Sequence, residues 1–164
     1  MEDKGFESDD GTRARSFVVN SLASRAQSTA EIQAKLVVRE VPLHVIDEVV
    51  DEARRLGYLN DEELAAQLAR ASRTRRHGRA RAARELRRRR LGGPQLEAAL
   101  ETAYADVDEV ELAAAALGSR PCRDPRECRR AVAYLVRRGF STGIAWRAVR
   151  ARGERPDPPP YSSR

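Results

Sequence analysis

A run of arginines between residues 73 and 90 is the part of this sequence with the clearest chemical potential. The basic segment, RTRRHGRARAARELRRRR, holds ten arginines and a single acid in eighteen residues. Guanidinium groups remain charged at any physiological pH, and they bind carboxylates and phosphates through paired hydrogen bonds. The segment therefore predicts a surface that binds an anionic partner.

Residues that could catalyse a reaction or hold a metal are few and scattered. His44 and His77 stand alone, and we expect a solvated side chain at His44 and a turn at His77. Cys122 and Cys128 lie six residues apart with no histidine near them, which is not a zinc spacing, so we expect free thiols. The sequence contains no glycine-rich phosphate loop and no paired-carboxylate motif. It predicts no catalytic residue, no metal and no cofactor, and a protein that is not an enzyme.

Composition supports an anionic partner but calls for caution about arginine counts. The chain of 164 residues has a net charge of +6 and a pI of about 10.0. Only Lys4 and Lys35 among its 31 basic residues are lysines, a bias that a GC-rich coding sequence produces without selection for binding. The N-terminus is acidic, and the longest apolar runs, such as Leu112–Leu117, have only six residues, which predicts a cytoplasmic protein with no signal peptide and no membrane contact.

Apolar residues recur along the chain with a spacing that repeats three times. Five marker residues are separated by steps of 4, 5, 5 and 4, and the whole set returns after 50 and again after 49 residues. Such a period indicates tandem structural repeats. The three sets are Ile32, Leu36, Val41, Ile46 and Val50; Ala82, Leu86, Leu91, Leu96 and Leu100; and Ala131, Leu135, Phe140, Ala145 and Val149.

Each repeat is expected to contain three helices, which makes the protein all-α. Helix-starting signals support the divisions: "STAE" at 28–31 is a capping box, "NDEE" begins at Asn60, and "DPRE" begins at Asp124. We expect three tandem three-helix repeats of about 50 residues in an elongated, modestly curved array. The expected boundaries are an acidic disordered tail at 1–11, repeats at 12–58, 59–106 and 107–152, and a proline-rich disordered tail at 153–164.

The basic segment falls on the middle helix of the second repeat. At 100° per residue, three arginines lie roughly 160–220° from the inward-facing Leu86, namely Arg81, Arg84 and Arg88. Arg87 flanks this stripe, and Arg73, Arg75 and Arg76 extend it before the turn. Glu85 lies off the stripe, so we expect clustered arginines that lack acidic partners and bind an anionic surface. The competing interpretation is a solvated face that is rich in arginine through genomic bias.

The other repeats match this pattern less well. Arg130 and Arg137 lie opposite Leu135 in the third repeat and are further candidate contacts. Trp146 corresponds to Asp47 and Glu97, outward positions, so either the third repeat packs differently or Trp146 is an exposed contact residue. In the first repeat, Ala34 and Val38 lie opposite Leu36. These two side chains either pack against the first helix or contact a partner, and we favour packing.

Two stretches, "LGYLNDEELAAQLARAS" at 56–72 and "HGRARAARELRRRRL" at 77–91, resemble the RecX family of bacterial recombination regulators. The first carries that family's junction at Gly57–Asp61, and the second carries its basic turn with Gly78 and its Glu85–Leu86 pair. Arg90–Leu91 replaces the family's usual Gly–Ile, whereas "RRGFS" at 137–141 keeps the form of the third repeat. The resemblance covers roughly residues 12–152.

The resemblance implies a non-enzymatic inhibitor. Such proteins bind the RecA recombinase, alone or as a filament on single-stranded DNA, and lodge in the groove of the filament. They block filament extension, ATPase activity, strand exchange and coprotease activity. We expect a monomer whose arginines contact the filament, with weak direct DNA binding in addition. The alternatives are a direct DNA-binding protein without sequence specificity and a purely structural helical adaptor.

Overall fold

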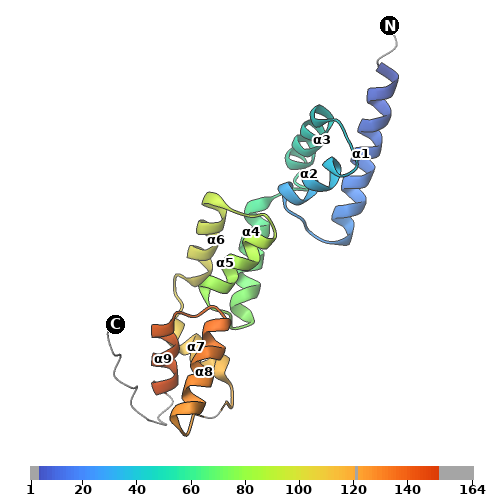
Figure 1. Ribbon diagram of the computed structural model, residues 1–164. Coiled ribbons are helices and arrows are strands. Elements are labelled where there is room, and N and C mark those ends of the chain that lie inside the picture. The colour runs from blue at the N-terminus through green and yellow to red at the C-terminus, as the bar shows by residue number, and fades with distance from the viewer. Residues whose placement is uncertain (1–3, 121, 152–164) are drawn as a thin grey trace, which may run out of the picture. The chain divides into compact units, whose positions relative to one another are not determined.

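A computed structural model describes residues 4–120 and 122–151, and every regular element within these ranges is a helix (Figure 1). The described part contains no strand, which confirms the all-α class. The helices follow the order expected of three three-helix repeats. They are α1 (Lys4–Ser24), α2 (Thr29–Val37), α3 (Leu43–Arg55), α4 (Asp61–Thr74), α5 (Arg79–Arg88), α6 (Gly93–Tyr104), α7 (Glu109–Leu117), α8 (Pro125–Arg137) and α9 (Thr142–Ala151).

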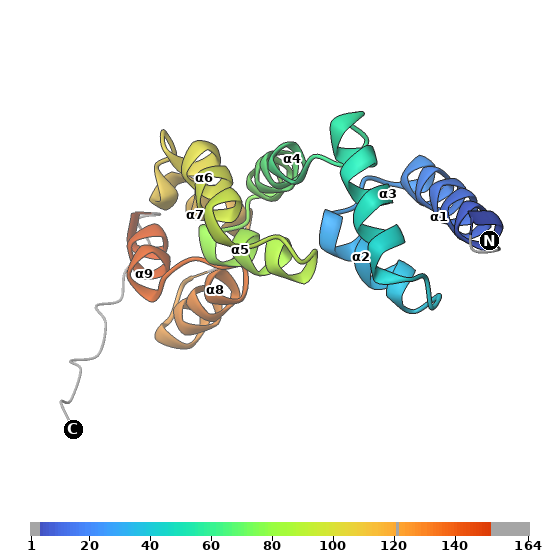
Figure 2. The ribbon, with the colours of Figure 1, turned by 90° about the horizontal axis from the view of Figure 1, so that it is seen from above.

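The chain divides into two compact units. Of the described residues, one unit holds those up to Gln67 together with Leu86–Ala99, and the other holds Leu68–Glu85 together with those from Leu100 to Ala151. In the first unit α3 packs against both α1 and α2 (Figure 2). In the second unit α9 packs against α7 and α8, which also contact each other. Helices α4, α5 and α6 contribute residues to both units.

The marker residues are the interior positions of the fold. All of them are buried except Val41, which is half-buried. Ile32, Leu36 and Val50 anchor the core of the first repeat, and Leu135 and Phe140 lie in that of the third. The 4, 5, 5, 4 spacing therefore identified buried positions in every repeat.

The five-residue step between the second and third markers has a hydrogen-bonding cause. The N–H of the third marker donates to the carbonyl of the second: Val41 to Leu36 (3.2 Å), Leu91 to Leu86 (3.1 Å) and Phe140 to Leu135 (3.2 Å). The residue before the third marker has a left-handed φ: 58° at Glu40, 56° at Arg90 and 94° at Gly139. This bond and a left-handed residue together form the Schellman motif, which ends a helix and satisfies its last carbonyls. The same turn thus ends α2, α5 and α8.

The predicted helix caps form. Ser28 Oγ accepts a hydrogen bond from the Glu31 amide (3.1 Å), and the Glu31 carboxylate accepts one from the Ser28 amide (2.9 Å). Asn60 Oδ1 accepts from the amide of Glu63 at 3.0 Å. Asp124 Oδ1 accepts from the amide of Glu127 at 2.8 Å. These caps satisfy backbone donors that the first turn of a helix leaves without partners.

The start of the chain differs from the expected disordered tail at 1–11. Helix α1 begins at Lys4 and so includes most of that segment. Asp9 and Arg13 form an ion pair of 2.8 Å one turn apart, which adds a small stabilisation to this part of the helix. The repeat boundaries stay predictions, and the proline-rich tail at 153–164 lies outside the described residues.

The expectation of free thiols is wrong. Cys122 and Cys128 form a disulfide, with their Cα atoms 4.6 Å apart. The turn that begins α8 at Asp124 and Pro125 lies between them and brings the two side chains together. Both cysteines are buried in the core of the third repeat, so the spacing that does not match a zinc site serves a crosslink instead.

Breaking this crosslink should destabilise the third repeat. A closed loop this short is expected to contribute about 2 kcal/mol by restricting the unfolded chain. Thermal unfolding of the wild type should therefore move to lower temperature in dithiothreitol. The double variant Cys122→Ala/Cys128→Ala should not respond to the reductant. An identical melting curve for the wild type with and without reductant would contradict a stabilising disulfide.

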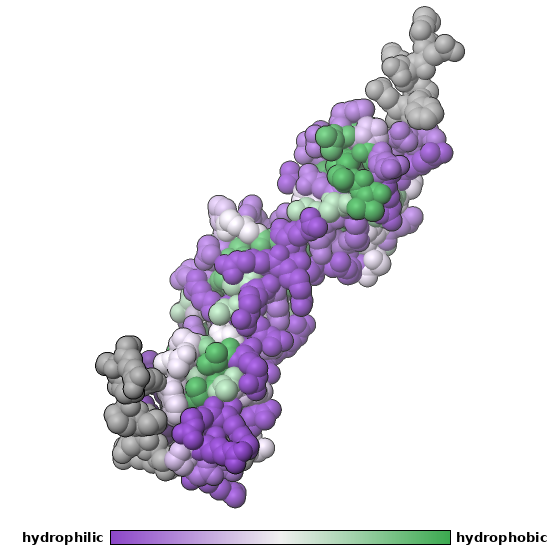
Figure 3. Space-filling view, in the orientation of Figure 1, coloured by the Kyte–Doolittle hydropathy of each residue, from purple (hydrophilic) through white to green (hydrophobic). Residues whose placement is uncertain are grey.

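The first repeat exposes apolar side chains, and the expected packing of Val38 is wrong. Val38 is 80% exposed, because it is the C-cap residue of α2 and lies beyond the helix face that packs on its neighbours. Val37 and Leu43 beside it are also exposed, whereas Ala34 is half-buried. Figure 3 shows hydrophobic surface over the first repeat.

Candidate partner-binding surface

Helix α5 carries four of the nine candidate contact arginines. Its buried side consists of Ala82, Ala83 and Leu86, with Leu86 fully enclosed. The small alanines and the leucine hold one side of the helix inside the protein, so the arginines between them must face outward. The inward orientation of Leu86 therefore matches the expectation from the sequence.

Three arginines of α5 form what we call the arginine face: Arg84, Arg87 and Arg88. All three are exposed. Among the hydrogen bonds and ion pairs within the described residues, none is made by their guanidinium groups. Like charges on one helix repel one another unless an anion is placed against them. This face is therefore the part of α5 best prepared to receive an anionic partner.

Arg81 differs from the arginine face. Its Nε donates to Glu85 Oε1 at 3.3 Å, one helical turn away, and its side chain is only 42% exposed. Glu85 lies off the stripe on the helix, as expected, yet the long side chain of Arg81 reaches it. Arg81 is thus partly neutralised, and its charge is less available than that of Arg84 or Arg88.

The arginines before the turn divide between structural and exposed positions. Arg73 donates to the carbonyl of Ala103 at 3.1 Å, and Arg76 donates to that of Ala115 at 3.2 Å. Both carbonyls belong to the last turns of helices, where oxygens lack partners within the helix. Arg75 is exposed. Arg73 and Arg76 therefore hold the ends of α6 and α7, whereas Arg75 extends the exposed charge.

His77 is a buried residue. Its Nδ1 lies 3.2 Å from Ser72 Oγ and 3.4 Å from Glu85 Oε1, and its carbonyl accepts a hydrogen bond from the Tyr104 hydroxyl at 2.9 Å. Burial lowers the pKa of His77, and the charge of Arg81 lowers it further. The neutral imidazole therefore fixes the turn between α4 and α5. His44, by contrast, is exposed, as predicted.

A contact between two turns of the second unit holds the start of α5. Gly78 donates its N–H to the carbonyl of Arg138 at 2.9 Å, and Ala80 donates to the carbonyl of Gly139 at 3.3 Å. In return, the Arg138 guanidinium donates to the carbonyls of Arg75 and Arg76. We call this contact the turn clamp. Sequence reasoning missed Arg138, because nothing in a one-dimensional pattern relates residues that lie about sixty positions apart.

Arg89 was also missed, and its role is structural. Its guanidinium donates to both carboxylate oxygens of Glu31 at 2.9 and 3.1 Å, and to the carbonyl of Ala26. Burial alone would raise the pKa of Glu31, but the hydrogen bonds from Arg89 and the Ser28 amide outweigh it and lower the pKa. This arginine of the basic segment therefore joins the second repeat to the capping box of the first.

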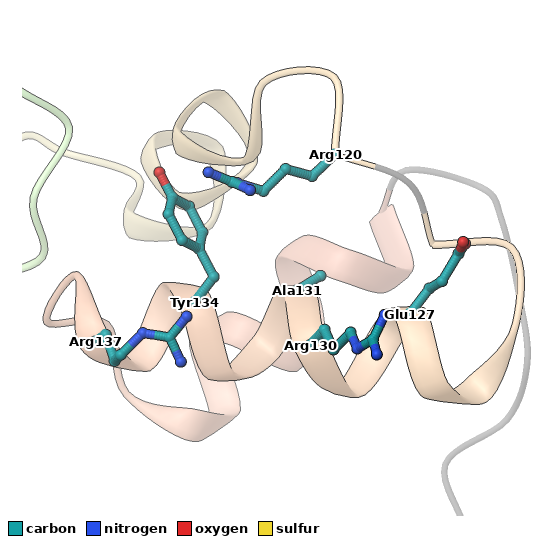
Figure 4. Close-up of a pocket in the computed structure, with 6 residues that line it drawn as sticks. All are labelled: Arg120, Glu127, Arg130, Ala131, Tyr134 and Arg137. Carbon is teal, nitrogen blue, oxygen red and sulfur yellow. The ribbon is translucent and has the colours of Figure 1, made fainter.

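The candidate residues of the third repeat lie on α8 and α9. Arg130 and Arg137 are exposed on α8 beside a hollow that also involves Arg120 and Tyr134 (Figure 4). Trp146 is half-buried and packs against the core of the third repeat. The alternative in which the third repeat packs differently at this position therefore describes Trp146 better than a fully exposed contact.

Within residues 4–120 and 122–151, no group of three or more histidine, cysteine, aspartate or glutamate side chains could hold a metal ion. None of the helices described there has the length and apolar character needed to span a membrane.

The nine helices of residues 4–120 and 122–151 place the chain in the class of helical-repeat proteins. Comparisons with known proteins narrow this class. No family model matches the chain. It is 33% identical over 139 residues to Regulatory protein RecX of Deinococcus radiodurans, an alignment that covers 82% of this chain and 65% of that protein. It is 30% identical to Regulatory protein RecX of Mycobacterium sp. (strain JLS) and of Streptomyces coelicolor, with 78% and 76% of those proteins covered. The chain belongs to the RecX family of regulatory proteins.

Solved structures agree on the fold. The crystal structure of RecX from Lactobacillus salivarius superposes with a TM-score of 0.77 at 19% identity, covering 88% of this chain and 97% of that one. A second crystal structure of regulatory protein RecX gives a TM-score of 0.70 at 20% identity, covering 84% and 70%. At these identities the likeness concerns the helical fold alone. The chain spans just under two thirds of the Deinococcus relative.

Proposed function

We propose that this protein binds the RecA recombinase in the helical groove of its filament on single-stranded DNA, and that it thereby inhibits filament extension. ATPase, strand-exchange and coprotease activities fall as a consequence. Membership of the RecX family supports a regulatory role. The observation that carries the proposal to particular residues is the arginine face, whose three exposed guanidinium groups have no hydrogen-bond or ion-pair partner among the residues that the structure describes.

The physical basis is electrostatic complementarity. A nucleoprotein filament offers phosphate groups and acidic side chains within reach of one another, and guanidinium groups bind both through charge-assisted hydrogen bonds. Arg84, Arg87 and Arg88 form the centre of the proposed contact, and Arg75 extends it. Arg130 and Arg137 provide a second contact on α8. Arg73, Arg76 and Arg81, which make internal hydrogen bonds, keep these groups in position. Added salt should weaken such binding steeply.

Inhibition of RecA is the direct test. Near-stoichiometric or lower amounts of the protein should slow ATP hydrolysis and strand exchange by the cognate RecA, because a bound regulator obstructs growth of the filament. Steady-state ATPase assays and strand-exchange gels measure both effects. Unchanged RecA turnover at a saturating concentration of the protein would contradict the proposal.

The exposed arginines also fit a second function, direct DNA binding without sequence specificity. A single comparison separates the two functions: binding to bare single-stranded DNA against binding to the same DNA coated with RecA. The RecA proposal predicts clearly tighter binding to the coated strand. Equal or tighter binding to the bare strand would favour the DNA-binding function.

A further inference from the structure

A hollow beside α8 has a composition suited to a multiply charged anion. It has a volume of about 360 Å³, within the range of small-molecule sites. Figure 4 shows its lining, in which Tyr134 and two arginines project from α8 and the guanidinium group of Arg120 lies next to the tyrosine ring. The lining residues are Arg120, Glu127, Arg130, Ala131, Tyr134 and Arg137.

The geometry of α8 explains why these side chains meet. Arg130, Tyr134 and Arg137 follow one another at steps of four and three residues, which places them on the same side of the helix. The small side chain of Ala131 leaves room between them. Arg120 reaches in from the connection that follows α7, and its guanidinium lies 3.8 Å from the centre of the Tyr134 ring. The hollow therefore lies between one face of α8 and the side chain of Arg120, which comes from outside this helix.

Positive charge dominates the hollow. The lining contains three guanidinium groups and one carboxylate, that of Glu127. This carboxylate already accepts a hydrogen bond from the backbone amide of Arg123 at 2.9 Å. Neither Arg130 nor Arg137 forms an ion pair within the described residues. Burial alone would raise the pKa of Tyr134, but Arg120 and Arg138 outweigh it and lower the pKa, which reports the same positive potential.

The placement of the charges indicates the kind of anion. Arg130 and Arg137 are separated by two helical turns, roughly 10 Å along α8, so a single carboxylate is too small to bridge them. A chain of linked phosphates carries its charge over a comparable length and offers several oxygens to each guanidinium. Glu127, at one end of the hollow, would repel a nucleic-acid strand that continued past Arg130. The ligand that fits is therefore short and highly charged.

We propose that this hollow binds an oligophosphate chain, such as that of a nucleoside triphosphate, with Arg130 and Arg137 holding the phosphates and the Tyr134 hydroxyl donating a hydrogen bond to them. Binding involves no covalent step. The site requires neither RecA nor DNA, so it can be tested apart from the proposed function, although the same two arginines also serve there as the second contact. Inorganic tripolyphosphate and a nucleoside triphosphate carry the same kind of phosphate chain, and separate titrations with each of them distinguish the two ligands.

Isothermal titration calorimetry of the full chain tests the site, with inorganic tripolyphosphate, ATP and a single-stranded oligonucleotide as separate probes. The double variant Arg130→Gln/Arg137→Gln should lose at least tenfold in affinity for tripolyphosphate. The matched control Arg147→Gln/Arg150→Gln removes the same charge from exposed positions on α9 of the same repeat, and it should change the affinity less than twofold. Equal affinity for ATP and tripolyphosphate would show that the site recognises the phosphate chain alone. Tighter binding of ATP would show that the nucleoside contributes to the affinity as well.

Three results would overturn the proposal. The first is no binding of either oligophosphate at physiological salt, and the second is an equal loss of affinity for tripolyphosphate in the two double variants. The third is that only binding of the oligonucleotide depends on Arg130 and Arg137. The last would reassign the hollow to a nucleic-acid strand. Because the substituted side chains are exposed, each variant should retain its helical content, and circular dichroism measures this. A loss of binding without a loss of helix is then a property of the site.

Discussion

Reversing the charge of Arg84 and Arg88 is expected to weaken binding to RecA filaments about a hundredfold and to leave the helical content unchanged. Each lost charge-assisted contact costs about 1.5 kcal/mol or more where it is shielded from water, and two such contacts correspond to that factor. The variant Arg84→Glu/Arg88→Glu also introduces repulsion from the anionic partner. Fluorescence anisotropy with RecA-coated, labelled DNA measures the affinity.

The fold should tolerate this change, because both side chains are exposed and neither makes an internal hydrogen bond or ion pair among the described residues. A control variant, Arg13→Glu/Arg54→Glu, alters the net charge equally but at exposed ion pairs on α1 and α3. Such surface pairs contribute little to stability, so this variant should fold and retain its affinity within a few-fold. Equal losses in both variants would indicate a general charge effect.

A different result would reverse the interpretation of the basic segment. If Arg84→Glu/Arg88→Glu folds and binds with unchanged affinity and unchanged salt dependence, the arginine face is a solvated surface enriched through genomic bias. The contact residues would then have to be sought on α8, at Arg130 and Arg137.

Replacing Gly139 by alanine should destabilise the second unit by about 2–4 kcal/mol, through steric overlap and a strained backbone. A Cβ atom at this position would lie 2.4 Å from the backbone nitrogen of Arg81, and Gly139 has a φ of 94°. The turn clamp must therefore open or shift. Thermal unfolding should show a melting temperature lower by roughly 5–15 °C.

Gly143 provides the matched control in the same repeat. It lies in α9, and a Cβ atom there would meet nothing within 4 Å. Gly143→Ala should be neutral or slightly stabilising, because alanine favours a helix more than glycine does. Melting temperatures that do not differ between Gly139→Ala and Gly143→Ala would show that the close approach of the two turns is not maintained in solution.

The sequence by itself determined the interior of this protein. The marker residues are apolar at helical spacing, and burial of apolar surface depends mainly on residue type and local periodicity. Ile32, Leu86 and Leu135 are accordingly buried where the pattern places them. The caps at Ser28, Asn60 and Asp124 follow for a similar reason, since a capping side chain bonds to amides two or three residues away. Local chemistry was sufficient for these features.

The tertiary structure decided which arginines are available. Arg81, Arg84 and Arg88 are equivalent on a helical wheel, but Arg81 reaches Glu85 and the other two do not form ion pairs in the described part of the chain. Arg73 and Arg89 look no different in the sequence, yet they hold Ala103 and Glu31, which lie 30 and 58 residues away. Side-chain reach and distant backbone carbonyls are not encoded in periodicity.

The cysteines and Val38 illustrate the same limit. Composition and spacing favoured free thiols, but the turn at the start of α8 brings Cys122 and Cys128 to a Cα separation of 4.6 Å, close enough for a disulfide. Val38 was assigned to packing by its angle from Leu36, yet α2 ends before it and leaves it exposed. Short-range patterns determine which residues prefer the interior and where helices begin. Where a chain turns, and which distant groups then meet, depends on three-dimensional packing, because those contacts form between residues that no local rule connects.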